Sequence, residues 1–154
     1  MRPSLLQRTQ FLPITLENAW AFFSDPRNLP AITPPDLGFK ITSAVPDRMY
    51  AGMVLNYTVT PFPGLQFDWT TEITHVRECT FFVDEQRFGP YRFWHHQHFF
   101  QEAEGGIEMT DTVHYLLPFQ PLGQIAAGFV RKKLERIFDF RYQALEKLFC
   151  VNPM

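Results

Sequence analysis

The chain has 154 residues, a length that suits one domain with a substantial buried core. Its formal net charge of -2 argues against nucleic acid as a partner, and no stretch reaches the ~18 apolar residues of a membrane span. Seventeen Phe, five Tyr and three Trp form an aromatic content that favours a large core or a binding pocket.

Cysteine usage and the N-terminus bear on the compartment. Cys79 and Cys150 lie far apart and have no metal-ligand spacing, so we expect both to be reduced and non-catalytic. The N-terminus lacks the long apolar region of a signal peptide. Because no repeat or linker divides the chain, we predict a single domain over residues 1–154, located in the cytoplasm.

The first third of the chain predicts one strand and two helices. Residues 4–12 mix leucines with polar residues and end at Pro13, which indicates a strand. Thr15 suits a helix N-cap, and the apolar residues that follow it recur at helical spacing: Leu16, Ala19, Trp20 and Phe23. Asp25-Pro26 ends that helix and begins a second, short one.

From Phe39 the apolar pattern changes to a period of two, typical of strands. Turn signals such as Pro61-Phe62-Pro63-Gly64 separate these strands, which run to about residue 117. One long helix then follows, from about Gln124 to Phe149, with Arg141 near the middle of its apolar arc. Only this helix is long enough to cover the apolar face of the sheet. We therefore predict an α+β fold, a curved antiparallel sheet of six to seven strands around a long C-terminal helix.

The strand after Gly89-Pro90 carries imidazoles among large aromatic groups. Alternation places four of its side chains on one face: Trp94, His96, His98 and Phe100. A two-residue loop at Gly105-Gly106 would place Phe100 opposite Asp111 and His96 opposite Tyr115. The sequence thus predicts an inward face on which Asp111 and Tyr115 join the histidines, beneath the long helix.

A buried carboxylate needs a cation or hydrogen-bond donors. We predict that Asp111 pairs with Arg141 or accepts a hydrogen bond from Tyr115 or a histidine. Two interpretations stay open at this point. The cluster is either a satisfied structural network or a set of polar groups that orients a ligand in an apolar pocket.

Chemistry at these residues has several candidates. His96 and His98 with Asp111 suggest a metal, but a third histidine or a glutamate at fitting spacing is missing, so we expect no metal and no cofactor. The same three residues are the candidates for acid–base catalysis. Asp84 and Glu85 are consecutive and must point to opposite faces, and the sequence does not say which one faces inward.

A set of short segments and single residues, spread over nearly the whole chain, forms a familiar pattern. These are 21–26, 28–29, 33–35, Gly52, 69–73, 82–86, 89–91, Trp94, His96, His98, Phe100, 111–115, Pro118, 134–138 and Arg141. In this pattern the chain resembles the SRPBCC superfamily, the START-like helix-grip proteins, and within it the bacterial ligand-binding, polyketide cyclase/dehydrase-like members.

This resemblance implies a hydrophobic cavity between the sheet and the last helix. Members bind lipids, polyketides, quinones, plant hormones and other apolar molecules, and some are cyclases. The Rieske cysteine–histidine pattern of one branch is missing here. We expect a small hydrophobic ligand (lipid, polyketide, quinone or aromatic) held by Tyr57, Phe67, Trp69, Trp94, His96, His98, Phe100, Asp111, Tyr115, Phe129, Phe138 and Arg141.

Two other functions stay open. One is a polyketide cyclase or dehydratase that uses a pocket histidine as acid and base. The other is a partner-regulating protein whose cavity is filled by its own aromatic side chains. The sequence does not indicate the ligand, the oligomeric state or the pathway.

Overall fold

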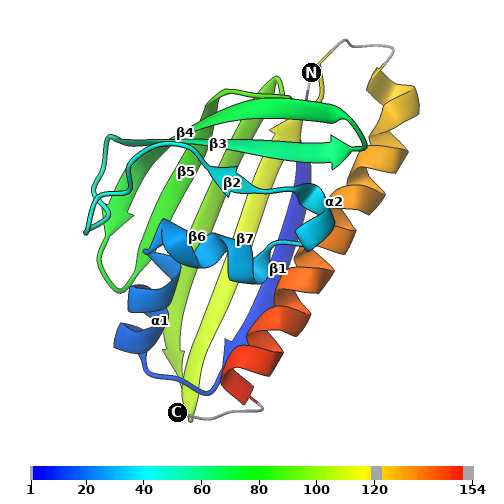
Figure 1. The fold of residues 1–154 in the computed structure, drawn as a ribbon. Helices are drawn as coiled ribbons and strands as arrows, with labels where there is room; N and C mark the ends of the chain where they lie inside the picture. The colour runs from blue at the N-terminus through cyan, green and yellow to red at the C-terminus, as the bar shows by residue number, and fades with distance from the viewer. Residues whose placement is uncertain (1, 119–122, 151–154) are drawn as a thin grey trace.

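A seven-stranded antiparallel sheet curves around a long C-terminal helix, as the sequence predicted (Figure 1). The computed structural model describes residues 2–118 and 123–150. The strands are ordered β1-β7-β6-β5-β4-β3-β2, so every neighbouring pair except β1 and β7 is also consecutive in the chain. In the described part of the chain, no helix combines the length and the apolar character that crossing a membrane requires.

The elements follow one another in the predicted order. They are β1 (Ser4–Leu12), α1 (Leu16–Phe23), the 3-10 helices η1 (Pro26–Ile32) and η2 (Pro35–Leu37), β2 (Lys40–Ile41), β3 (Met53–Phe62), β4 (Leu65–Arg77), β5 (Phe81–Phe88), β6 (Phe93–Ala103), β7 (Gly106–Leu116), α2 (Gly123–Leu145) and a closing π-helical turn, η3 (Glu146–Cys150). The predicted second short helix is therefore a 3-10 helix.

Local hydrogen bonds explain where the first two helices begin. The hydroxyl of Thr15 accepts a hydrogen bond from the backbone N–H of Asn18 at 3.2 Å, which makes it the predicted N-cap of α1. The carboxylate of Asp25 accepts one from the N–H of Arg27 at 3.0 Å and caps η1, with Pro26 in the first turn.

The β6–β7 hairpin differs from its prediction by the position of its loop. The two loop residues are Glu104 and Gly105, so Ala103 pairs with Gly106 and His98 with Asp111. Gly105 has a φ of +80°, which favours glycine in a tight turn. Gly106 already belongs to β7, where an added Cβ would overlap the carbonyl oxygen of Leu12. The partner of each residue moves by two positions, which leaves both faces of the hairpin unchanged.

Two apolar clusters fill the space between the sheet and the helices. One lies beneath α1 and the end of α2 and includes Leu12, Phe23, Phe82, Phe100, Met109 and Leu145. The other lies beneath the middle of α2 and comprises Leu6, Trp94, Val113, Tyr115, Leu134 and Phe138. Each of β6 and β7 contributes to both clusters, so the inward residues of these strands that lie between the clusters have apolar side chains on either side.

Helix α2 lies along β1 on the side of the sheet that also carries α1 (Figure 1). Its buried residues are Leu134, Phe138, Arg141 and Leu145, which recur at three- or four-residue spacing on one face. The side-chain amide of Gln10 on β1 donates to the carbonyl of Tyr142 at 3.0 Å and ties the helix to that strand. Arg141 is thereby placed over the middle of the sheet.

Candidate polar site and cavity

Five polar side chains meet between the two apolar clusters. They come from four elements: Asp84 on β5, His96 and His98 on β6, Asp111 on β7 and Arg141 on α2. Strand pairing accounts for the arrangement, since Asp84 lies opposite His96 and His98 lies opposite Asp111. We call these five residues the polar cluster.

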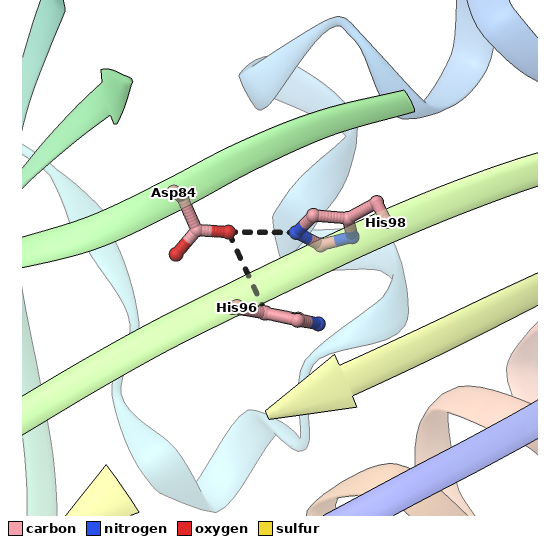
Figure 2. Close-up of side chains that lie close together, drawn as sticks. All are labelled: Asp84, His96 and His98. Atoms are coloured by element: carbon pink, nitrogen blue, oxygen red, sulfur yellow. Dashed lines mark hydrogen bonds and ion pairs between the residues drawn. The ribbon is translucent and has the colours of Figure 1, made fainter. Parts of the chain in front are cut away.

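On one side of the polar cluster, the two histidines converge on Asp84 (Figure 2). Nε2 of His98 lies 2.6 Å from Oδ2 of Asp84, and Nδ1 of His96 lies 3.5 Å from the same oxygen. The imidazole rings lie close together, with centroids 3.7 Å apart. One carboxylate oxygen therefore faces a nitrogen from each ring.

On the other side, the same two rings meet Asp111. Nε2 of His96 and Nδ1 of His98 each lie 3.0 Å from Oδ1 of Asp111. Nε of Arg141 lies 3.3 Å from Oδ2, which confirms the predicted pairing of Asp111 with Arg141. Asp111 is 1% exposed, so this carboxylate depends on its protein partners for stabilisation.

Both carboxylates are held in the ionised form. Burial would raise the pKa of Asp84, but the electrostatic attraction of the two imidazoles and a hydrogen bond from His98 outweigh it and lower that pKa. Burial acts on Asp111 in the same way, and there the charge of Arg141 with hydrogen bonds from both histidines lowers the pKa well below its ordinary value.

The two histidines are driven in opposite directions. Burial, together with the charge of His98, lowers the pKa of His96. For His98 burial also acts to lower the pKa, but hydrogen bonds to Asp111 and Asp84 outweigh it and raise the value. These opposite directions favour a proton on His98 over one on His96, and one protonated imidazole together with Arg141 would balance the two carboxylates.

Two adjoining cavities border the polar cluster. The larger has a volume of about 660 Å³ and lies between α2 and the strands β3, β4 and β6. The smaller has a volume of about 160 Å³ and reaches inward to Asp84, His96 and His98. Six residues line both cavities: Phe39, Tyr57, Trp69, Trp94, His96 and Arg141.

Most of the expected ligand-binding residues border these cavities. The larger one is lined by Tyr57, Phe67, Trp69, Trp94, His96, Phe129, Phe138 and Arg141, and His98 borders the smaller. Phe129 is 57% exposed and stacks with Phe62 near the outside, at a ring-centroid distance of 6.0 Å. The larger cavity is thus lined mainly by aromatic and other apolar side chains, with His96 and Arg141 among its few polar groups.

Three expected residues do not line either cavity. Phe100 packs against Trp20 and Phe23 in the apolar cluster beneath α1. Asp111 lies behind the two imidazoles, and Tyr115 packs edge-on against Tyr91, with ring centroids 6.1 Å apart. All three share a strand face with cavity residues, which alone does not bring a side chain to a cavity.

Asp84 is the site residue whose orientation the sequence left open. It faces the polar cluster, whereas Glu85 points to the outer face and contacts Nδ1 of His95 at 2.6 Å. Deciding between them from the sequence requires the register of β5 against β6. The residues between these strands carry Gly89-Pro90 but no two-residue turn, so their length does not indicate which residues pair.

Comparisons with known proteins agree with this architecture. The family model described as "Polyketide cyclase / dehydrase and lipid transport" matches residues 12–139. That range includes four of the five residues of the polar cluster and ends before the fifth, Arg141. No curated protein sequence matches the chain significantly.

Solved structures of similar fold come from several bacteria. A START superfamily protein from Mycobacterium smegmatis has a TM-score of 0.68 at 13% identity, over 94% of this chain and 98% of that one. Protein CV1439 from Chromobacterium violaceum has a TM-score of 0.73 at 11% identity, over 96% and 98%. Protein TTHA0849 from Thermus thermophilus has a TM-score of 0.69 at 16% identity, over 94% and 95%. These identities show a shared fold alone.

Proposed function

Because the chain belongs to the polyketide cyclase/dehydrase and lipid transport family, we propose that it binds a small hydrophobic molecule in the larger cavity. The ligand would be a lipid, polyketide, quinone or other aromatic compound. Its apolar body would lie between α2 and the strands, and its polar end would face His96 and Arg141.

The observation that carries this proposal is the cavity itself. A volume of about 660 Å³ falls in the range of roughly 300–1,000 Å³ that small-molecule sites occupy. Trp69, Trp94 and Phe138 line it, and burial of apolar ligand surface against them would supply affinity at about 25 cal/mol per Å². A cavity of this size also argues against the hypothesis of an interior filled by its own side chains.

A substitution that fills the cavity tests the proposal. Val130 lines the larger cavity from α2, whereas Lys132 on the same helix is exposed. In a fluorescent fatty-acid displacement assay, we expect Val130→Trp to weaken binding at least tenfold and Lys132→Trp to leave it unchanged. Native mass spectrometry of gently purified protein would show the guest directly. Equal binding by both variants, or failure with lipids, quinones and aromatics alike, would contradict the proposal.

A second candidate function is catalysis of the cyclase or dehydratase type. It is favoured by His96, which lines both cavities and whose pKa is lowered by burial, so that a neutral imidazole faces the ligand space. Such a group would accept a proton from an enolisable substrate. His96→Gln would then abolish turnover with binding retained, whereas in a binding protein it would change affinity alone.

A further inference from the structure

We propose that Asp84, His96 and His98 form a binding site for one divalent transition-metal ion. One ligand atom from each residue lies within 4.8 Å of the ligand atoms of the other two. Figure 2 shows the carboxylate and both imidazoles converging from the neighbouring strands β5 and β6. Because strand pairing determines these positions, the three groups are held together before any ion binds.

The ligand set indicates the kind of ion. Two imidazole nitrogens and one carboxylate oxygen suit Zn²⁺ or Fe²⁺, whereas Mg²⁺ and Ca²⁺ prefer sites made of oxygen. Three protein ligands leave at least one position for water or another molecule. This arrangement is typical of catalytic sites and differs from the closed four-ligand sites of structural zinc.

Asp111 supplies the support that metal-binding histidines need. A histidine that binds a metal through one nitrogen generally makes a second contact through the other, to a carboxylate or carbonyl. Here His96 and His98 each turn one nitrogen to Asp84 and the opposite nitrogen to Asp111, at 3.0 Å in both cases. Arg141 in turn holds Asp111 at 3.3 Å.

The smaller cavity supplies the open coordination position. All three proposed ligands line this space of about 160 Å³, which also adjoins Tyr57 and Thr71 and has room for a water molecule beside an ion. With neutral imidazoles, Asp84, Asp111 and Arg141 have a net charge of -1. A divalent ion would raise it to +1, so the open position would favour an anionic oxygen such as hydroxide or carboxylate.

Metal binding is tested with the metal alone, without reference to the hydrophobic ligand. Chelator-treated protein without an affinity tag is titrated with Zn²⁺ by calorimetry and with Co²⁺ by visible absorption. We expect one ion per chain and a cobalt spectrum of low coordination number with nitrogen ligands. Asp84→Asn and His98→Gln should each weaken binding roughly 100-fold or more, and Asp111→Asn about 10- to 100-fold.

The matched control lies on the same two strands. Glu85 and His95 form the equivalent carboxylate–imidazole contact at 2.6 Å on the outer face of the sheet. His95→Gln should leave stoichiometry and affinity unchanged. Absence of saturable binding by the unmodified protein would overturn the proposal, as would loss in His95→Gln alone. If the ligand variants fail to fold, the unmodified protein still provides a test. A spectrum of its cobalt mixture identical to that of the hydrated ion would overturn the proposal.

Discussion

A charged side chain with almost no solvent contact is the most consequential residue of this structure. Asp111 pairs with Arg141, is hydrogen-bonded to His96 and lies 3.0 Å from Nδ1 of His98, so its removal leaves a buried guanidinium without this counter-ion. Removing one partner of a buried ion pair lowers stability strongly, because it leaves an uncompensated charge. Replacing both partners by apolar residues of similar size often changes stability little. The stability of the protein should therefore depend on the balance of charge in the cluster.

We expect Asp111→Asn to lower the free energy of unfolding by about 3–5 kcal/mol. Urea denaturation of chelator-treated protein measures this value. Asp139, an exposed residue whose carboxylate lies 3.7 Å from Arg8, provides the control, since Asp139→Asn removes a solvated pair of little weight. Combining Asp111→Leu with Arg141→Met should recover much of the loss, and a double variant no more stable than Asp111→Asn would contradict this explanation.

The same carboxylate predicts a dependence on pH. The folded-state pKa of Asp111 is lowered, so its contribution is fully present above the pKa of the unfolded chain and is lost as pH falls toward the folded value. The difference in unfolding free energy between the native protein and Asp111→Asn should shrink as pH falls from about 5 to about 2. A difference that stays constant over this range would show that charge is not its origin.

Contacts between single residues were predicted correctly where the prediction did not depend on the register between two strands. The contact between Asp111 and Arg141 followed from two polar residues predicted on facing apolar surfaces, for which no accurate register was needed. The contact of Asp84 with the histidines did not follow, because it depends on how β5 lies against β6. The metal interpretation was set aside for want of a third ligand, and Asp84, the third ligand of the site proposed above, could be identified only from that register.

At the scale of elements, the alternation of apolar residues locates a strand, but the turns determine which residues of neighbouring strands pair. Period-two patterns located β3 to β7 because each strand has one buried face. They placed the β6–β7 loop one residue too far along the chain, since Gly105 and Gly106 are both glycines but for different reasons. Gly105 has a left-handed backbone, whereas Gly106 lies against the backbone of β1.

This difference predicts opposite effects for two alanine substitutions. Gly106→Ala would place a Cβ on the Leu12 carbonyl oxygen and 2.9 Å from Cα of Pro13, so β1 and β7 would have to separate. We expect a loss of at least about 2 kcal/mol in unfolding free energy. Gly128 in α2 has open space around it, and Gly128→Ala should stabilise the protein by about 0.5–1 kcal/mol. Thermal denaturation of both variants measures this contrast, which a neutral Gly106→Ala would refute.

For the molecule as a whole, the fold follows from the need to cover the one apolar face of the sheet. The long helix was predicted to do so, and α2 buries Leu134, Phe138 and Leu145 against the sheet. The cavity was less predictable, because its size depends on how far the strands β3 and β4 stand from that helix. A sequence pattern shows which side chains face inward but not how much space they leave unfilled.

The two proposed occupants should protect different parts of the molecule. A hydrophobic guest would contact β3, β4 and the first half of α2, whereas an ion would bind between β5 and β6. Hydrogen exchange reports the opening of each segment separately. We expect exchange to slow over residues 57–62 and 129–138 with a fatty acid, and over residues 82–86 and 95–99 with Zn²⁺. Protection of the same segments by both would mean that they occupy one site, and the two proposals would then have to be merged.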